Sequence, residues 1–278
     1  MLDGFCEYLR QQGKSENTVK SYCQGVKEYM RWHEETFGKR MKMLIRANVL
    51  DYISYLRTVK ELNNRSVNAK LASLHSFNLY LISAGYKTEV VLTKEDYLKV
   101  QTAYASPSTV DRGEVERFRQ EILENNGIRD YAIVTILAYA GLRISECLEL
   151  RMGDISLAAR EITVRHGKGD KMRVVYFGNK VANAVREYLK SRPATENPYL
   201  FPGRGDSHLT RGQVNRIFNA HSASITPHTL RHFFCSNALE NGYNIGELAN
   251  QAGHSNVHTT LLYTNPTKEK MKEKANLL

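Results

Sequence analysis

The side chains best suited to chemistry in this sequence are basic groups and one phenol, spread over several segments of its second half. A tyrosine hydroxyl has a pKa of about 10, so it is a weak nucleophile at neutral pH unless a base accepts its proton or nearby cations favour the phenolate. Positive charge and hydrogen-bond donors around a phenol would suit attack on a phosphodiester. The candidate residues are Arg143, Lys168, His228, Arg231, His254 and Tyr263.

Arg143 lies between two predicted helices. Gly141 is expected to end an apolar helix over residues 131–140 in a left-handed conformation, and the next helix contains Glu146. A guanidinium held between helices presents a planar fork that matches two phosphate oxygens. The alternative is an ordinary ion pair between Arg143 and Glu146, which are three residues apart.

His228 and Arg231 are three residues apart on a predicted helix over residues 227–241, with Thr226 as its N-cap. They should project from one face near the positive end of that helix, which suits phosphate binding beside proton transfer. The alternative is an ordinary surface pair. His232 is expected to point elsewhere and is left out of the candidate set.

The other three candidates are placed at turns or helix ends. Lys168 lies in a glycine-containing turn within residues 161–177, whose flanks alternate as a β-hairpin does, so it should sit at the hairpin tip. His254 follows the predicted helix over residues 245–251, and Tyr263 should end a short helix. Taken singly, these are a solvated lysine close to Arg173, a loop histidine and one of 16 tyrosines.

The elements that must position these residues fall into two groups. Residues 1–100 show helical periodicity, with predicted helices over residues 2–12, after Ser15, near residues 46–58 and over residues 66–84. The periodicity fades over residues 101–110. The fold is therefore predicted to be mainly α with a small β-hairpin, in two domains. These are a helical bundle (1–100) and, after a linker (101–110), a second domain (111–278) opened by a capping box from Asp111 to Glu114.

Charge and cysteine usage narrow the class of protein. The 278 residues include 39 Lys plus Arg against 29 Asp plus Glu, a net charge of +10 that suits a polyanionic partner, although a merely basic protein fits equally. Cys6, Cys23, Cys147 and Cys235 form no paired motif, so we expect reduced thiols with neither a zinc site nor a disulfide. No leader or apolar run of about 20 residues is present, so a cytoplasmic protein off the membrane is expected.

Considered together, the order and spacing of the candidate residues resemble the tyrosine recombinase, or phage-integrase, family. The resemblance covers essentially the whole chain. Its most specific segments are AGLRISE (140–146), TPHTLRH (226–232), GHS (253–255) and TTLLYT (259–264). Small departures are Phe234 and Cys235, where the family often has smaller or hydroxylated residues, and His258, which we interpret as a bystander near the tyrosine.

The resemblance implies a helical core-binding (SAM-like) domain and a catalytic domain acting on double-stranded DNA with no metal, nucleotide or other cofactor. Tyr263 would attack the scissile phosphate to form a 3′-phosphotyrosyl link, and a partner strand's 5′-hydroxyl would reverse the step. Arg143 and Arg231 would bind the non-bridging oxygens, and Glu146 would support the site. Lys168 would protonate the leaving 5′ oxygen, His228 would handle the nucleophile's proton, and His254 would hydrogen-bond the phosphate.

The resemblance also implies a homotetramer on two synapsed sites, with the tail (266–278) docked on a neighbouring protomer. The chain begins almost directly with the core-binding helices, which favours a Xer-like recombinase or a transposon cointegrate resolvase on nucleoid DNA, with accessory DNA-binding proteins as further partners. The alternatives are an integrase of a mobile element, a type IB topoisomerase and an inactive DNA-binding module.

Overall fold

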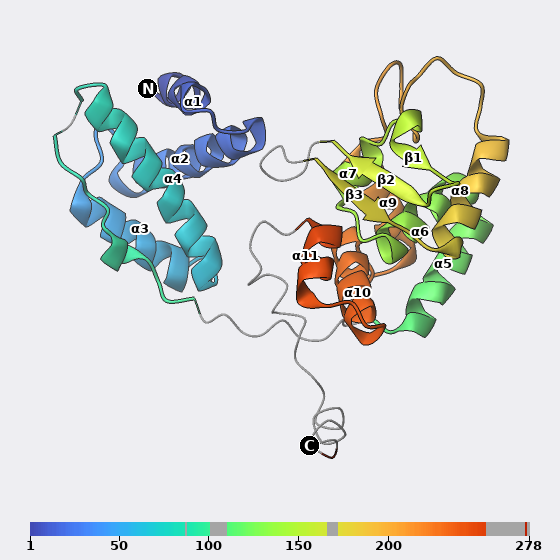
Figure 1. Cartoon of the computed structure of the whole chain (residues 1–278). Coiled ribbons are helices and arrows are strands. Elements are labelled where there is room, and N and C mark those ends of the chain that lie inside the picture. The colour runs from blue at the N-terminus through green and yellow to red at the C-terminus, as the bar shows by residue number, and fades with distance from the viewer. Residues whose placement is uncertain (87, 101–109, 166–171, 254–275, 277–278) are drawn as a thin grey trace. The chain divides into compact units, whose positions relative to one another are not determined.

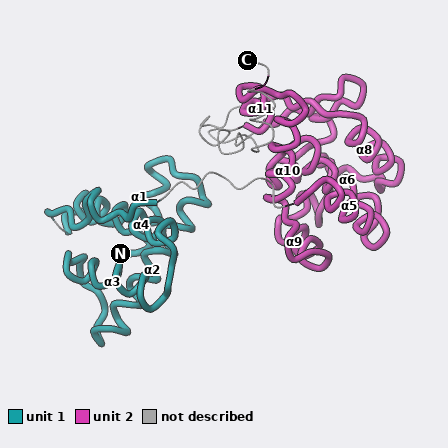
Figure 2. Tube along the Cα trace, turned by 90° about the horizontal axis from the view of Figure 1, so that it is seen from below, with its two compact units in different colours: residues 1–102 teal, residues 103–278 magenta. Residues whose placement is uncertain are grey.

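The chain divides into two compact units, residues 1–102 and 103–278, which Figure 2 colours separately. In the part that can be described, both units are built mainly of helices, and three short strands lie in the second (Figure 1). The predicted fold class is therefore confirmed. The computed structural model describes residues 1–86, 88–100, 110–165, 172–253 and 276.

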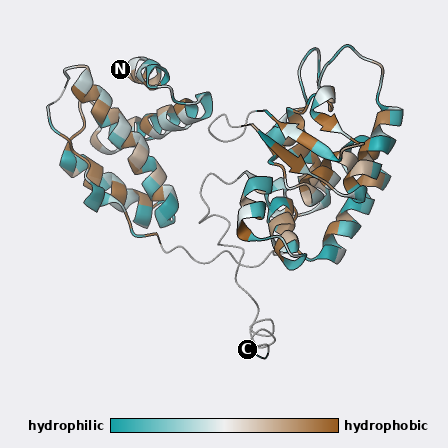
Figure 3. Ribbon diagram, in the orientation of Figure 1, coloured by the Kyte–Doolittle hydropathy of each residue, from teal (hydrophilic) through white to brown (hydrophobic). Residues whose placement is uncertain are grey.

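The first unit is a helical bundle, and two of its helices begin at polar caps. The Ser15 hydroxyl accepts a hydrogen bond from the Thr18 N–H, and the Asn63 side chain accepts one from the Ser66 N–H. The helix predicted from residue 66 therefore begins two residues earlier. Apolar residues recur along one face of each helix and pack inward (Figure 3). The helices are α1 (Leu2–Gln11), α2 (Glu16–Phe37), α3 (Arg46–Thr58) and α4 (Asn64–Ser83).

A disulfide joins α1 to α2 and corrects one prediction from the sequence. Cys6 and Cys23 are bonded, with their Cα atoms 6.0 Å apart, whereas Cys147 and Cys235 are free and buried. The expectation of four reduced thiols is therefore wrong for the first pair. Motif spacing could not reveal this pair, because the packing of two helices, not a short local motif, brings the cysteines together.

The second unit is organised around one buried helix, α6. Because opposite sides of α6 are covered, eight of its 12 residues are buried, and these eight lie between Asp130 and Ala138. It packs against α5, α8 and α10, and it ends at Tyr139, four residues before Arg143. The helices of this unit are α5 (Arg112–Asn126), α6 (Ile128–Tyr139), α7 (Ile144–Leu148), α8 (Asn179–Ser191), α9 (Arg211–His221), α10 (Pro227–Glu240) and α11 (Ile245–Ala252).

The strands of this unit, β1 (Ile155–Ser156), β2 (Glu161–Val164) and β3 (Arg173–Tyr176), form an antiparallel sheet in the order β1-β2-β3. Ile162 pairs with Ile155 on one side and with Val175 on the other. The predicted hairpin is confirmed by the pairing of β2 with β3. β1 was not predicted, because two residues are too few to show a strand's alternation.

Candidate active site

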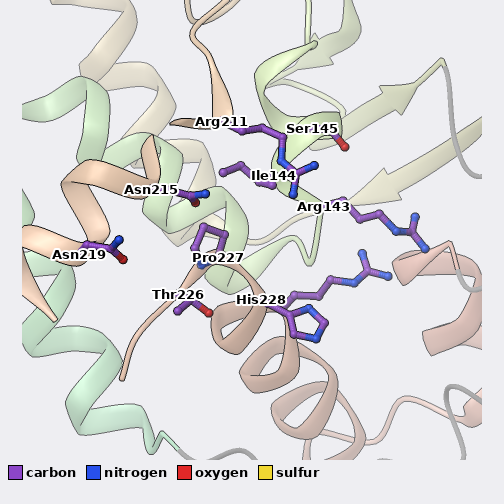
Figure 4. A pocket seen from close by; sticks show the side chains of 10 residues that line it. Arg143, Ile144, Ser145, Arg211, Asn215, Asn219, Thr226, Pro227 and His228 are labelled. Carbon is purple, nitrogen blue, oxygen red and sulfur yellow. The ribbon is translucent and has the colours of Figure 1, made fainter. Parts of the chain in front are cut away.

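A pocket of about 600 Å3 lies where the start of α7, one face of α9 and the first turn of α10 meet (Figure 4). Arg143 and His228 extend toward the same side of this pocket, and α9 contributes polar side chains at four-residue spacing. The lining residues are Arg143, Ile144, Ser145, Arg211, Asn215, Asn219, Thr226, Pro227, His228 and Arg231. Three of the six residues predicted from the sequence therefore share one pocket.

Arg143 occupies the N-cap position of α7, where its backbone is extended. The Glu146 carboxylate accepts the Arg143 N–H at 2.8 Å and its Nη1 at 2.7 Å, while Nη2 donates to the Gly253 carbonyl at 2.6 Å. The side chain remains 30% exposed, so part of the guanidinium faces the pocket. The ion pair considered from the sequence is real, and it orients a guanidinium that stays open to an anion.

Arg231 is the most deeply buried of the three arginines that line the pocket, with 6% of its surface exposed. Its Nη1 donates to the Gly141 carbonyl at 2.6 Å, and its Nη2 donates to the Ala252 carbonyl at 2.5 Å. Burial, with a smaller contribution from the charge of Arg143, lowers the pKa of Arg231 to about 10. The Arg231 guanidinium is therefore still charged at neutral pH, and its hydrogen bonds to two carbonyls fix its orientation.

Gly141 makes this arrangement possible because its φ is +68°, a left-handed conformation that a side chain would strain. A Cβ at this position would lie 2.2 Å from a ring carbon of Phe234 on α10. The glycine thus lets the chain turn between α6 and α7 while α10 packs directly against the turn. Phe234, a departure from the family pattern, fills the space that the missing side chain leaves.

His228 lies in the first turn of α10, where the Thr226 hydroxyl accepts the Thr229 N–H at 3.1 Å. Its Nε2 is 2.8 Å from Nε2 of His232, so one ring donates a hydrogen bond to the other. The prediction that His232 points elsewhere is wrong. Residues four apart share a face of a helix, and that spacing was the signal that could have found it.

The two imidazoles share a lowered affinity for protons. Loss of solvent and the nearby charge of Arg231 lower the pKa of His228 below its ordinary value of 6.5. Loss of solvent, His228 and Arg231 lower the pKa of His232 in the same way. At neutral pH the pair is therefore uncharged, and an uncharged imidazole can accept a proton.

Glu146 is the buried carboxylate at the centre of the site, with 5% of its surface exposed. It contacts Arg143 and also Arg173 at the start of β3, whose Nη1 and Nη2 donate to its two oxygens at 2.9 and 2.8 Å. Burial opposes its ionisation, but the hydrogen bonds from Arg173 and the charges of both arginines outweigh it, so the pKa of Glu146 is lowered. Arg173 was not among the predicted site residues.

Lys168, His254 and Tyr263 lie outside the described residues, as do His258 and most of the tail. The structure describes the strands that flank the Lys168 segment and ends its continuous description at Gly253, immediately before His254. Within the described residues, no cluster of histidine, cysteine and acidic side chains could hold a metal ion. In the same part of the chain, no helix has the length and apolarity to cross a membrane.

Residues 109–270 match the model of the phage integrase family, and residues 1–86 match the model of its N-terminal SAM-like domain. The chain belongs to the phage integrase family. It is a tyrosine recombinase, an enzyme that breaks and rejoins DNA strands at specific sites. The resemblance seen in the sequence is thereby confirmed.

Several members of the phage integrase family align with nearly the whole chain. TnP I resolvase of Bacillus thuringiensis is 49% identical over 278 residues, which cover 99% of this chain and 98% of that protein. Tyrosine recombinase XerA of Thermococcus kodakarensis is 32% identical, with 100% and 96% covered.

Solved structures agree with the fold. The crystal structure of XerA recombinase matches with a TM-score of 0.54 at 26% identity, covering 99% of this chain and 97% of that one. The Tn1549 transposon integrase in complex with transposon right end DNA matches with a TM-score of 0.72 at 20% identity, covering 99% and 98%. At that identity the second match shows the shared fold alone.

Proposed function

We propose that this tyrosine recombinase resolves DNA molecules that carry two copies of its recombination site, as a transposon cointegrate does. The support is its identity of 49% with a resolvase over essentially the full length of both chains. Its double-stranded DNA substrate would be nucleoid DNA, bound by the core-binding domain (1–100) and by the catalytic domain (111–278). The net charge of +10 favours such a polyanionic partner.

The observation that carries the catalytic proposal is an imbalance of charge around the pocket. Arg143, Arg173 and Arg231 approach one buried carboxylate, Glu146, so about two positive charges are not neutralised within the described residues. The charge of Arg143 contributes to the lowered pKa of Arg231, and an anion between the two side chains would offset that repulsion. A scissile phosphate, with two non-bridging oxygens, supplies that anion and receives both guanidinium groups.

Tyr263 is the proposed nucleophile. Its phenolic oxygen attacks the phosphorus, the bond to the 5′ oxygen breaks, and a 3′-phosphotyrosyl link and a free 5′-hydroxyl result. Lys168 protonates the departing 5′ oxygen, and His254 donates a hydrogen bond to the phosphate. The 5′-hydroxyl of a partner strand then reverses the step, so the energy of the broken bond is kept in the link.

The proton of Tyr263 is proposed to pass to His228. The lowered pKa of His228 leaves the ring neutral, and in the tautomer whose Nε2 donates to His232 the Nδ1 atom of His228 can accept the proton. The pair therefore offers one acceptor to the phenol at neutral pH. His232 acts through His228 and makes no contact with DNA in this scheme.

The assembly is proposed to be a homotetramer on two synapsed sites, with accessory DNA-binding proteins as further partners. The tail of each protomer, with Met271, Ala275, Leu277 and Leu278 at roughly helical spacing, would dock on its neighbour. Two synapsed sites present four strands for cleavage, and each protomer holds one candidate tyrosine.

The deciding experiment uses a nicked suicide substrate that carries the recombination site, which footprinting of DNA flanking the gene would define. The wild-type chain should form a covalent protein–DNA complex and strand-exchanged product. Tyr263→Phe should abolish the covalent complex while the Kd for DNA changes less than about threefold, because only one hydroxyl is lost. Tyr86→Phe, at an exposed tyrosine of the first unit, is the matched control and should react normally.

The outcomes separate the proposed role from its alternatives. A covalent complex without exchanged product would indicate a topoisomerase-like reaction, and binding without any covalent complex would indicate an inactive DNA-binding module. A plasmid with two directly repeated sites should be resolved into two circles faster than two plasmids are joined. The reverse preference would indicate an integrase of a mobile element.

A further inference from the structure

We propose that Arg173 is a positioning residue of the active site. It fixes the position of Glu146, and through Glu146 that of Arg143, relative to β3 and to the end of α11. The inference rests on the proposed function of the pocket. Arg173 is the first residue of β3, and its side chain is only 13% exposed. It does not line the pocket, so it acts on the reaction through other groups.

The contact with Glu146 has the geometry of a two-pronged ion pair. Nη1 of Arg173 donates to Oε1 at 2.9 Å and Nη2 donates to Oε2 at 2.8 Å, in the parallel arrangement that a guanidinium forms with a carboxylate. The same two oxygens also accept Nη1 and the backbone N–H of Arg143. The carboxylate thus receives four hydrogen bonds and is shared by two elements that lie 27 residues apart.

A second set of contacts ties Arg173 to the end of α11. Its Nε is 3.3 Å from the Gln251 carbonyl, and its guanidinium lies against Gly253, where a Cβ would come within 2.5 Å of Cζ. Gly253 has a φ of +67° and its carbonyl accepts Nη2 of Arg143. A glycine at this position therefore permits both arginines to approach the turn that precedes His254.

The other end of β3 is fixed to the same helix. The Gln251 side chain, which is buried, accepts the Tyr176 N–H at 3.1 Å and donates to the Tyr176 carbonyl at 2.5 Å. β3 therefore contacts α11 at both of its ends. These contacts therefore connect three described elements, the start of α7, strand β3 and the end of α11.

Arg173 also controls how much of Arg143's charge remains for DNA. Its contacts are the leading cause that opposes burial and keeps Glu146 ionised. Without Arg173, the buried carboxylate would have Arg143 as its remaining ion-pair partner among the described residues. The negative charge of Glu146 would then be balanced by Arg143 alone. Arg143 would therefore attract the phosphate less strongly.

The test compares Arg173→Met and Arg173→Lys with the wild-type chain on the suicide substrate. Under single-turnover conditions, Arg173→Met should slow formation of the covalent complex on the order of 10- to 100-fold, as the loss of groups behind a reactive site commonly does. The Kd for DNA should change less than about threefold, since Arg173 does not line the pocket that contains Arg143 and His228. Arg173→Lys, which keeps the charge but not the two-pronged geometry, should lie between Arg173→Met and the wild type.

The pH profile distinguishes positioning from simple support of the fold. In Arg173→Met the pKa of Glu146 should rise, so acidification below neutral pH protonates the carboxylate and releases Arg143. The ratio of variant to wild-type cleavage rate should therefore increase as the pH falls. Glu146→Gln combined with Arg173→Met should likewise react faster than Arg173→Met alone. A ratio independent of pH, with no rescue by Glu146→Gln, would contradict the inference.

Controls separate this inference from the proposed function. Arg129→Met removes an arginine that pairs with buried Asp130 at 2.8 Å on α6 and lies outside the pocket, and it should leave the cleavage rate unchanged. Failure of the wild-type chain to form a covalent complex would refute the proposed function. If the wild-type chain forms the covalent complex normally and Arg173→Met and Arg173→Lys form it equally fast, the role of Arg173 is refuted but the proposed function is not. If Arg173→Met does not fold, Arg173→Lys and its pH profile decide.

Discussion

Replacing Gly141 by alanine tests whether the turn before Arg143 is set by close packing against α10. The φ of +68° is costly for any residue with a Cβ, by about 1–2 kcal/mol. The added carbon would also lie 2.2, 2.5 and 2.8 Å from three ring carbons of Phe234, an overlap that costs about 1–3 kcal/mol when a packed core must shift. Gly141→Ala should therefore lower the free energy of unfolding of the second unit by about 2–5 kcal/mol.

The control is Gly205→Ala in the same unit. Gly205 has a φ of +61°, and nothing lies within 4 Å of its added Cβ, so only the backbone strain of about 1–2 kcal/mol applies. Urea unfolding of the full chain, followed by circular dichroism, measures both variants. The single tryptophan, Trp32, lies in the first unit, and its fluorescence transition should not move in either variant.

A double variant identifies the cause of the loss. Phe234→Ala removes the ring that the new Cβ meets, so Gly141→Ala combined with Phe234→Ala should cost less than the sum of the single changes, by about 0.5–3 kcal/mol. Cleavage should also slow in Gly141→Ala, because the Gly141 carbonyl orients Arg231 at 2.6 Å. Equal losses in Gly141→Ala and Gly205→Ala, with additive double-variant energies, would refute the packing argument.

Two further predictions concern protons and the disulfide. The pKa values of His228 and His232 are lowered in the folded chain, so the unfolded chain takes up protons first. The free energy of unfolding should therefore fall as pH drops below about 6.5. His232→Gln should reduce the dependence of this free energy on pH, measured by urea titrations between pH 5 and 7. An unchanged pH dependence would contradict the lowered pKa of His232. Reducing the Cys6–Cys23 bond, which spans 17 residues, should destabilise the first unit by about 3 kcal/mol in Trp32-monitored unfolding. An unchanged transition would show that the bond adds no stability.

Several elements could be predicted because their signals lie within a few residues of one another. Thr226 and Pro227 mark the start of α10, and its predicted range of 227–241 differs by one residue from Pro227–Glu240. Asp111 and Glu114 form the capping box expected at the start of α5. Alternation around a glycine-rich turn marked the β2–β3 hairpin. Caps, periodicity and turn residues act locally, so the sequence alone is enough to identify them.

Other features depended on which elements pack together. Cys6 and Cys23 became partners through the packing of α1 on α2, and His232 joined the site through its orientation on α10. The cysteine pair could not be told from ordinary buried thiols in the sequence, whereas the four-residue spacing of His228 and His232 was a local signal that they share a helix face. The predicted locations of Lys168, His254 and Tyr263 remain predictions, because those residues lie outside the described part of the chain.

By itself the sequence determined the family, the helical class of the fold and the identity of three residues, Arg143, His228 and Arg231, that line one pocket. Only the tertiary structure decided how Arg143 and Arg231 are oriented, because the carbonyls of Gly141, Ala252 and Gly253 that hold them come from chain segments up to 110 residues away. It also made Arg173 part of the site. Long-range hydrogen bonds depend on the packing of whole elements, and residue spacing along the chain does not encode that packing directly.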